Sequence, residues 1–166
     1  MVWLAEQGHQ VIGVELSPVA VKAFFDDNAL PVTKHRTCNF THWKSGRITI
    51  LCGDYFALTA DDIGTIDAIY DRAALTALPD DIRHLYITHQ KKLVVPAGTI
   101  FLLTIEDAGE IATLEEAIGV DCEVADLYGA THAIRIAYVE SVMEEYAGNE
   151  SGSRRAEYKV YRMSGK

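Results

Sequence analysis

The sequence predicts an α/β protein whose mostly parallel sheet ends in an antiparallel β-hairpin. Up to Ile105, short apolar runs alternate with segments of helical spacing, an order typical of parallel sheets covered by helices. Acidic residues stand where several of these runs end. Two β-prone segments then close the chain on either side of a Gly- and Ser-containing tip at 148–153. No linker or internal repeat interrupts residues 1–166, so we expect a single domain.

The composition is that of an ordinary globular protein. The 166 residues are 49% hydrophobic and 23% charged, with a formal net charge of −9. Such a charge repels phosphate backbones and anionic lipid surfaces, so nucleic acid is not an expected partner. No apolar run reaches the roughly 18 residues of a membrane span, and no signal-type segment is present. We expect a soluble, cytoplasmic protein that does not bind membranes.

A strand followed by a capped helix opens the chain. Met1 to Gln7 has the pattern of a helix that ends at Gly8, and Val11–Leu16 is an apolar strand carrying one acid, Glu15. Ser17 and Pro18 then predict the start of a helix that extends to Asn28. In nucleotide-binding α/β folds an acid at this place accepts hydrogen bonds from ribose hydroxyls. The alternative is that Glu15 simply faces solvent.

A second acid follows a long polar segment. Residues 31–46 show no clean period, which predicts a loop that carries an exposed Trp43 and acts as a lid. A strand then begins at Arg47 and ends at Gly53 and Asp54. Asp54 is therefore the second acid at a strand end.

The third strand end carries an acid and a base. Ile66–Tyr70 is the pattern of a central strand covered on both faces, and Asp71 and Arg72 follow directly. The carboxyl ends of parallel strands form the ligand crevice of open α/β sheets, which favours a functional role for this pair. An equally strong interpretation is that Asp71 caps the next helix and that Arg72 forms a salt bridge with Asp71.

The rest of the chain predicts further helices and strands. Pro79 starts a helix whose buried stripe is Ile82, Leu85, Tyr86, His89 and Leu93. A strand over 99–105 precedes an acidic segment, 106–128, that has a helical apolar face. Residues 133–143 and 155–163 are the strands of the closing hairpin.

The cysteines and histidines do not predict a metal site. Cys38, Cys52 and Cys122 are not arranged in a CxxC or Cys/His pattern, and we expect them to be reduced or buried thiols. His35 and His42 share a segment with Cys38, but a spacing of seven residues in an irregular loop is a weak signal.

Five motifs in register resemble the thiopurine S-methyltransferase family, in particular its bacterial branch. They are Trp3-Leu4-Ala5-Glu6-Gln7-Gly8-His9, Val11-Ile12-Gly13-Val14-Glu15-Leu16-Ser17, Cys52-Gly53-Asp54-Tyr55-Phe56-Ala57-Leu58, Ile63-Gly64 and Tyr70-Asp71-Arg72-Ala73-Ala74-Leu75. The resemblance implies a Rossmann-like class I methyltransferase fold that uses S-adenosylmethionine. It covers roughly residues 1–105.

The resemblance also implies roles for individual residues. Glu15 would bind the ribose hydroxyls, Asp54 would lie near the exocyclic amine of adenine and Tyr55 against its face, and Tyr70 would join these cofactor-binding residues. Arg72, with Asp71, would form the catalytic pair, Arg72 stabilising a thiolate or another anion of a small-molecule acceptor. An arginine suits this role because it keeps its own proton.

Two features depart from the family pattern. The family has a strand and a glycine-containing turn before the helix that includes Trp3, whereas this sequence starts inside that helix. After Ile105 the family has an acid and a Gly-Pro-Pro-Phe loop, which this sequence lacks. We therefore expect either an N-terminally truncated product or a descendant without the cofactor turn. In the second case a homo-oligomer would cover the open sheet edge.

Three functions remain open from the sequence. The first is methyl transfer from S-adenosylmethionine to a thiol or another soft nucleophile, including an oxyanion of selenium or tellurium. The second is a non-catalytic binding or assembly protein that keeps the methyltransferase fold. The third is a dinucleotide-dependent oxidoreductase, because Glu15 would serve a nicotinamide cofactor equally well. Asp54 and the Asp71–Arg72 pair favour the first over the third.

Overall fold

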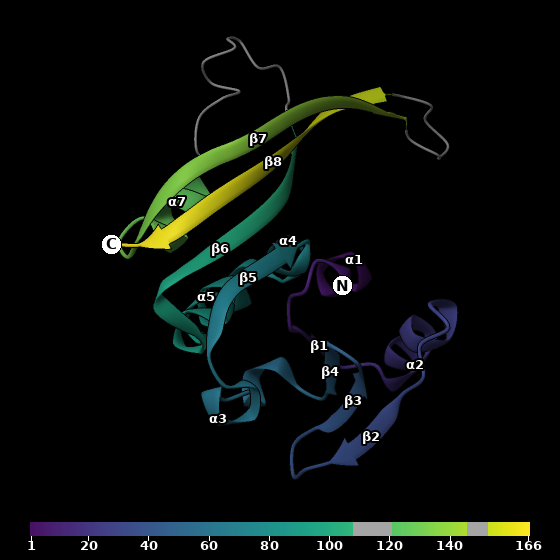
Figure 1. The fold of residues 1–166 in the computed structure, drawn as a ribbon. Coiled ribbons are helices and arrows are strands. Elements are labelled where there is room, and N and C mark those ends of the chain that lie inside the picture. The colour runs from purple at the N-terminus through teal and green to yellow at the C-terminus, as the bar shows by residue number, and fades with distance from the viewer. Residues whose placement is uncertain (108–120, 146–152) are drawn as a thin grey trace. The chain divides into compact units, whose positions relative to one another are not determined.

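The computed structural model describes residues 1–107, 121–145 and 153–166 (Figure 1). The described chain forms two compact units, Met1–Gly64 and Thr65–Lys166. Both combine helices with a four-stranded sheet, which confirms the predicted α/β class. The single domain over 1–166 stays a prediction.

The first unit carries the predicted strand, capped helix and second strand. In β1, Val11–Glu15 pairs in parallel with β4, Ile48–Cys52. The Ser17 hydroxyl accepts a hydrogen bond from the Ala20 N–H at the start of α2, and Pro18 is the first helical residue, as predicted. The remaining elements are α1 (Val2–Glu6), α2 (Pro18–Asp27), β2 (Thr33–Arg36), β3 (Thr41–Ser45), the 3₁₀ helix η1 (Tyr55–Ala57) and α3 (Ala60–Ile63).

The predicted loop over 31–46 is wrong, because this segment forms the antiparallel hairpin β2–β3. Trp43 is buried at 7% exposure and stacks on Phe25 of α2, with ring centroids 6.1 Å apart. The Lys34 ammonium lies 3.4 Å from the centre of the indole ring. All four residues of β2 are exposed at the sheet edge, where charged side chains are normal, so the segment lacks the apolar pattern of an inner strand.

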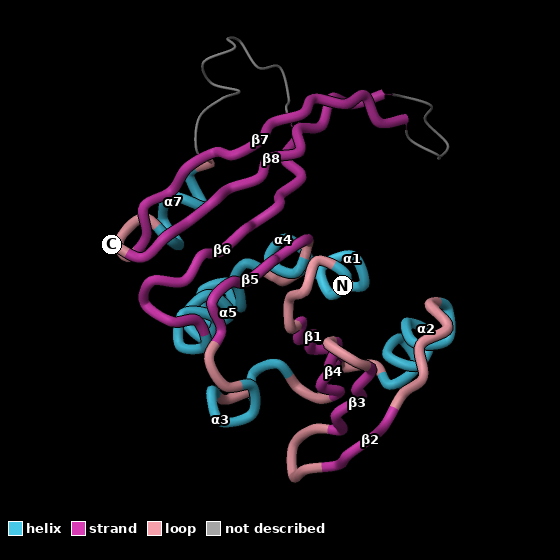
Figure 2. Tube along the Cα trace, in the orientation of Figure 1, coloured by secondary structure: helices cyan, strands magenta, loops and turns pink. Residues whose placement is uncertain are grey.

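The second unit contains the Asp71–Arg72 strand and the closing hairpin. Its sheet has the order β5-β6-β8-β7, with β5 and β6 parallel and β8 antiparallel to both of its neighbours. Figure 2 shows the long strands of this unit beside its helices. The elements are β5 (Ile66–Arg72), α4 (Ala74–Ala77), α5 (Asp80–Leu93), β6 (Val94–Asp107), α7 (Cys122–Tyr128), β7 (His132–Glu145) and β8 (Ser153–Gly165).

Antiparallel pairing is more extensive than the sequence predicted. The parallel pairs are β1–β4 and β5–β6, which are the strands that carry the candidate site residues or support them. The β2–β3 hairpin adds antiparallel pairs in the first unit, beside the C-terminal hairpin that was predicted. Each parallel pair nevertheless brings the carboxyl ends of its two strands together, and ligands bind at such ends in open α/β sheets.

The buried side of α5 differs from the predicted stripe. Tyr86 and Leu93 are buried as predicted, but Leu85 is 62% exposed and Gln90 is completely buried. The reason is that Tyr86 and Gln90 both hydrogen-bond to Asp71, which turns this side of α5 toward the sheet. Hydrophobic spacing predicted that Leu85 is buried, and it gave no indication that the polar Gln90 is buried instead.

Strand β5 is not covered on both faces as predicted. Asp71 is buried at 2% exposure, whereas Tyr70 is 61% exposed. Successive strand residues face opposite sides, so only the side that carries Asp71 is packed in this unit. The strand itself has the predicted position and extends through Arg72.

The acidic segment lies largely outside the described residues. Its predicted helical face falls within 108–120, as does most of the segment that replaces the Gly-Pro-Pro-Phe loop. The last part forms α7, in which Val124 and Tyr128 are buried. The Asp121 carboxylate caps this helix by accepting hydrogen bonds from the N–H groups of Glu123 and Val124.

Candidate active site

Two acidic strand ends meet in the first unit. Glu15 pairs with Cys52 across the parallel strands β1 and β4, and the Gly53 N–H donates to the Glu15 carbonyl over 3.0 Å. Asp54 follows Gly53, just beyond the end of β4, so the two predicted acids stand on neighbouring chain segments. The structure thus brings Glu15 and Asp54 to one edge of the sheet.

The Glu15 side chain is exposed but oriented. Its Oε1 accepts a hydrogen bond from the Ser17 N–H over 2.7 Å, just before the first turn of α2. This contact fixes the carboxylate above the end of β1 while leaving most of it open to solvent. A carboxylate held in this way can accept hydrogen bonds from two vicinal hydroxyls, as a ribose offers.

Asp54 is placed by its own helix cap. Its Oδ1 accepts a hydrogen bond from the Phe56 N–H over 2.9 Å and starts the 3₁₀ helix η1. Tyr55 and Phe56 follow, with ring centroids 5.8 Å apart at a T-shaped angle, and Phe56 is 43% exposed. An acid beside two aromatic rings matches an adenine base, which has an amine donor and a flat face. Phe56 was not predicted as a site residue, although its place directly after Tyr55 in the Cys52–Leu58 motif was the available signal.

Gly53 keeps these groups close to the neighbouring loop. A Cβ atom at this position would lie 2.5 Å from a ring carbon of Phe40 and 2.6 Å from the Asn39 carbonyl oxygen. Only glycine therefore fits between Cys52 and Asp54 without movement of the backbone. The Cys52 thiol has its pKa raised by burial and by the Glu15 charge, so it stays protonated and is a poor nucleophile.

Tyr70, Asp71 and Arg72 end β5 in the second unit. Tyr70 and Arg72 are exposed and share one face of the strand, whereas Asp71 points to the other face, where α5 packs. Asp71 accepts hydrogen bonds from the Tyr86 hydroxyl over 2.8 Å and from Gln90 Nε2 over 3.3 Å. The predicted salt bridge between Asp71 and Arg72 is thus replaced by hydrogen bonds from α5. Tyr86 and Gln90 were not singled out for this role.

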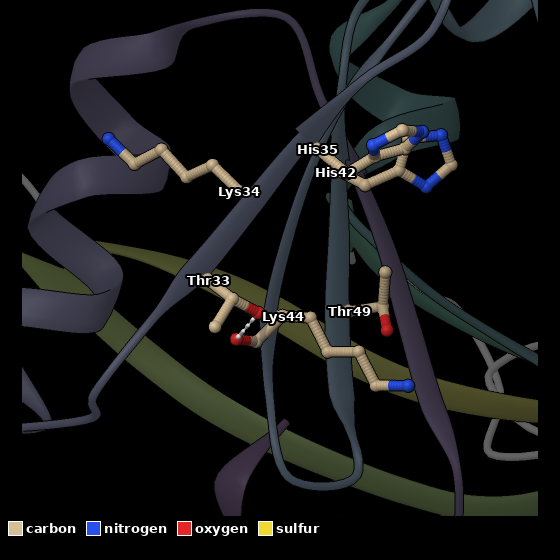
Figure 3. A pocket seen from close by; sticks show the side chains of 6 residues that line it. All are labelled: Thr33, Lys34, His35, His42, Lys44 and Thr49. Atoms are coloured by element: carbon tan, nitrogen blue, oxygen red, sulfur yellow. Dashed lines mark hydrogen bonds between the residues drawn. The ribbon is translucent and has the colours of Figure 1, made fainter.

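A hollow on the face of the first sheet opposite Trp43 contains two histidines but does not form a metal site. It is lined by residues of β2, β3 and β4, and Figure 3 shows the rings of His35 and His42 beside each other while Lys34 points away. Their ring centroids are 6.3 Å apart. Within the described residues no group of three potential metal ligands comes together. The three cysteines are free, and Cys38 and Cys122 are exposed.

Comparison with known proteins assigns a family. The sequence model of the thiopurine S-methyltransferase family matches residues 1–166. The chain belongs to this family. Thiopurine S-methyltransferase from Stutzerimonas stutzeri is 54% identical over the whole chain, which spans 70% of that protein. The enzyme from Nitrosospira multiformis is 40% identical over 87% of the chain and 66% of its own length, and that from Bordetella petrii is 38% identical over 98% and 75%.

Solved structures of other methyltransferases have a fold similar to that of this chain. The N-methyltransferase NodS from Bradyrhizobium japonicum, in complex with S-adenosyl-L-homocysteine, has a TM-score of 0.55 at 13% identity, covering 92% of this chain and 66% of NodS. A methyltransferase from Methanosarcina mazei has a TM-score of 0.57 at 13% identity over 97% of this chain and 85% of its own. The predicted Rossmann-like class I methyltransferase fold is confirmed.

Family membership decides between the functions left open by the sequence. It supports S-adenosylmethionine as the cofactor and methyl transfer as the reaction, and it does not favour the non-catalytic alternative. A nicotinamide-dependent oxidoreductase is not supported either. In the described part of the chain no helix is long and apolar enough to pass through a bilayer.

Proposed function

We propose that this chain transfers a methyl group from S-adenosylmethionine to a thiol or a similarly soft nucleophile of a small molecule. The observation that carries the proposal is the pairing of the Glu15 and Asp54 strand ends in a member of the thiopurine S-methyltransferase family. Glu15 ends β1 and Asp54 follows the end of the adjacent parallel strand β4, and both carboxylates are exposed. They offer the acceptor atoms that ribose hydroxyls and an adenine amine require.

The first unit would hold the nucleoside part of the cofactor. Glu15 would accept hydrogen bonds from both ribose hydroxyls, because Ser17 already orients its carboxylate. Asp54 would accept one from the exocyclic amine of adenine, and Tyr55 and Phe56 would pack against the base. Tyr70 is proposed as a further cofactor contact, since its ring is 61% exposed beside Arg72.

The chemistry asks little of the protein beyond position and charge. The bound sulfonium supplies a methyl group that is already activated for displacement by a nucleophile. Arg72 would stabilise the thiolate form of the acceptor, because a guanidinium attracts an anion and does not lose its own proton. Holding the nucleophile in line with the methyl group then provides much of the acceleration. The protonated Cys52 thiol is not a competing acceptor.

A second acceptor class has the same electrostatic requirement. An oxyanion of selenium or tellurium carries the negative charge that the exposed Arg72 guanidinium would attract. We propose it after the thiol. A chromatographic assay of S-adenosylhomocysteine formation, with thiophenol and with selenite as separate acceptors, distinguishes the two. Product from neither acceptor would contradict both assignments.

The cofactor proposal is tested by titration calorimetry of S-adenosylmethionine and S-adenosylhomocysteine into the purified protein. Glu15→Gln keeps the size of the side chain and removes its charge, so affinity should fall roughly 10- to 100-fold as charge-assisted hydrogen bonds weaken. Asp27→Asn removes an equally exposed acid at the end of α2 and should leave the affinity unchanged. The absence of binding heat with folded protein, or equal affinities for both variants, would contradict the proposal.

We also propose that the protein forms a homo-oligomer and is cytoplasmic. β1 and β5 each stand at the end of a described strand order, and edge strands offer unpaired backbone groups. A homo-oligomer would cover such an edge, and light scattering that gives a monomer at high concentration would exclude it. A cytoplasmic location fits the free thiols of Cys38, Cys52 and Cys122.

A further inference from the structure

A buried chain of polar side chains starts at Asp71. Its carboxylate accepts hydrogen bonds from the Tyr86 hydroxyl and from Gln90 Nε2, and Gln90 Oε1 in turn accepts one from the Tyr128 hydroxyl over 2.8 Å. Asp71 is 2% exposed, and Gln90 and Tyr128 are completely buried. We call these four residues the Asp71 network; it joins β5, α5 and α7. Both hydrogen bonds to Asp71 reach Oδ2, and its buried Oδ1 has no hydrogen-bond partner among the described residues. A buried hydrogen-bonded network fixes one arrangement of the elements that it connects.

The network lies beside a strained turn. Ala73, directly after Arg72, has φ 64° and ψ −7°, a left-handed conformation that a side chain with a Cβ rarely adopts. Burial raises the pKa of Asp71, and the nearby backbone N–H groups of Leu75 and Ala74, in the first turn of α4, oppose part of this rise. Strain of this kind persists only where surrounding contacts hold it. Here the hydrogen bonds from Tyr86 and Gln90 hold Asp71, two residues before the strained Ala73.

Asp71 and Arg72 cannot act on the same ligand atom. They are neighbours on β5, and their side chains point to opposite faces of the strand. Asp71 faces the packed interior under α5, whereas Arg72 is exposed. A carboxylate on the interior face does not reach an acceptor that meets Arg72. The network can still decide where Arg72 points, because it holds Asp71, the residue directly before Arg72.

We propose that Asp71 is a positioning residue that, through the Asp71 network, fixes the turn at Arg72 and Ala73 and so holds Arg72 toward the acceptor. This inference rests on the proposed function only for the role of Arg72. It departs from a catalytic Asp71, because the carboxylate transfers no proton and touches no substrate. The Tyr128 hydroxyl, two residues away in the network, acts on the same turn.

The first test uses a mild variant at the far end of the network. Tyr128→Phe removes one hydroxyl and leaves Asp71, Tyr86 and Gln90 in place. We expect it to raise the KM for thiophenol roughly 3- to 10-fold, the loss of about one hydrogen bond, with the Kd of S-adenosylmethionine unchanged. Tyr161→Phe is the matched control: Tyr161 is equally buried, and its hydroxyl accepts a hydrogen bond from the Asp121 N–H. It should leave both constants unchanged.

The second test separates positioning from proton transfer. Asp71→Asn keeps the shape of the side chain, and its amide oxygen can still accept from Tyr86, so it should retain most of the kcat that Asp71→Ala loses. The double variant Asp71→Ala with Arg72→Ala should be no slower than Arg72→Ala alone, because both changes remove the same interaction. Equal losses of kcat for Asn and Ala would assign proton transfer to Asp71. Additive losses would leave it a purely structural role, and either result overturns the proposal.

A third readout does not depend on methyl transfer. Hydrogen exchange of the backbone amides over 72–75 reports how firmly the turn is held. We expect faster exchange in Tyr128→Phe and in Asp71→Ala, and wild-type exchange in Tyr161→Phe. Unchanged exchange in both network variants would overturn the positioning role even in an active enzyme. Faster exchange in a protein that methylates no acceptor would refute the proposed function and leave the network intact.

Discussion

Arg83 joins three helices of the second unit, and its replacement should cost more stability than the loss of its ion pair. Its Nη1 donates to both carboxylate oxygens of Glu123 in α7, over 2.8 and 2.9 Å. Its Nε and Nη2 donate to the carbonyls of Leu78 and Thr76, over 2.9 and 3.3 Å, at the end of α4. The hydrogen bonds and charge of Glu123, with a smaller contribution from Asp80, raise the pKa of Arg83.

The structure separates the two contributions. The Glu123 side chain is 46% exposed, so the ion pair should be worth only about 0.5–1 kcal/mol after solvent screening. The two hydrogen bonds to carbonyls should add about 1 kcal/mol each. Glu123→Gln should therefore lower the free energy of unfolding by about 0.5–1 kcal/mol, and Arg83→Met by about 2–3 kcal/mol. Methionine matches arginine in helix propensity, which removes that variable.

Urea unfolding at low and at high salt is the assay. The loss in Glu123→Gln should shrink in about 1 M salt, because the pair is partly exposed, whereas most of the loss in Arg83→Met should remain. Equal losses in the two variants, or a loss in Arg83→Met that disappears with salt, would show that the carbonyl contacts stabilise nothing. In that case α4 would not be held by Arg83.

Three other substitutions test packing, backbone space and charge. Phe25→Ala should cost about 3–5 kcal/mol of unfolding free energy, because the ring is 2% exposed and stacks on Trp43; a loss under about 1 kcal/mol would contradict this packing. Gly53→Ala should cost about 1–3 kcal/mol and weaken cofactor binding, since its Cβ would meet Phe40 at 2.5 Å, and an unchanged Tm would refute it. Burial raises the pKa of Asp71, so the stability that its protonated form contributes is complete below the unfolded-state pKa and is lost as pH rises through the folded-state pKa. Urea titrations should therefore show wild type losing stability relative to Asp71→Asn as pH rises above about 4, and a flat difference would exclude this linkage.

Local chemistry allowed much of the first unit to be predicted. Ser17 and Pro18 start a helix whatever surrounds them, because the cap and the fixed φ act within one turn. Gly8, with φ 94°, ends the preceding helical segment for an equally local reason. Glu15 and Asp54 were found because strand ends and acids are both visible in the sequence. Their proximity followed from the parallel pairing of β1 and β4, in which Glu15 is the partner of Cys52.

The hairpin over 33–45 could not be predicted from periodicity. In β3 the buried residue is Trp43, and its neighbours His42 and Lys44 face the hollow on the other side. In β2 every residue is exposed, so an edge strand has the composition of a loop. What makes this segment a strand is its pairing with β4 and the packing of Trp43 on Phe25. Both depend on residues that lie elsewhere in the sequence.

The Asp71–Arg72 pair shows how much of a site can be predicted from the sequence. Alternation along a strand requires that the two side chains face opposite ways, but it does not say which one faces inward. That choice comes from Tyr86 and Gln90, which are four residues apart on one side of α5 and offer two donors to a carboxylate. An arginine on the inner side would have met the donor Gln90 Nε2, and a guanidinium cannot accept a hydrogen bond from it. The identity of the α5 residues therefore assigns the carboxylate to the interior and leaves the guanidinium at the surface, where an anionic acceptor can reach it.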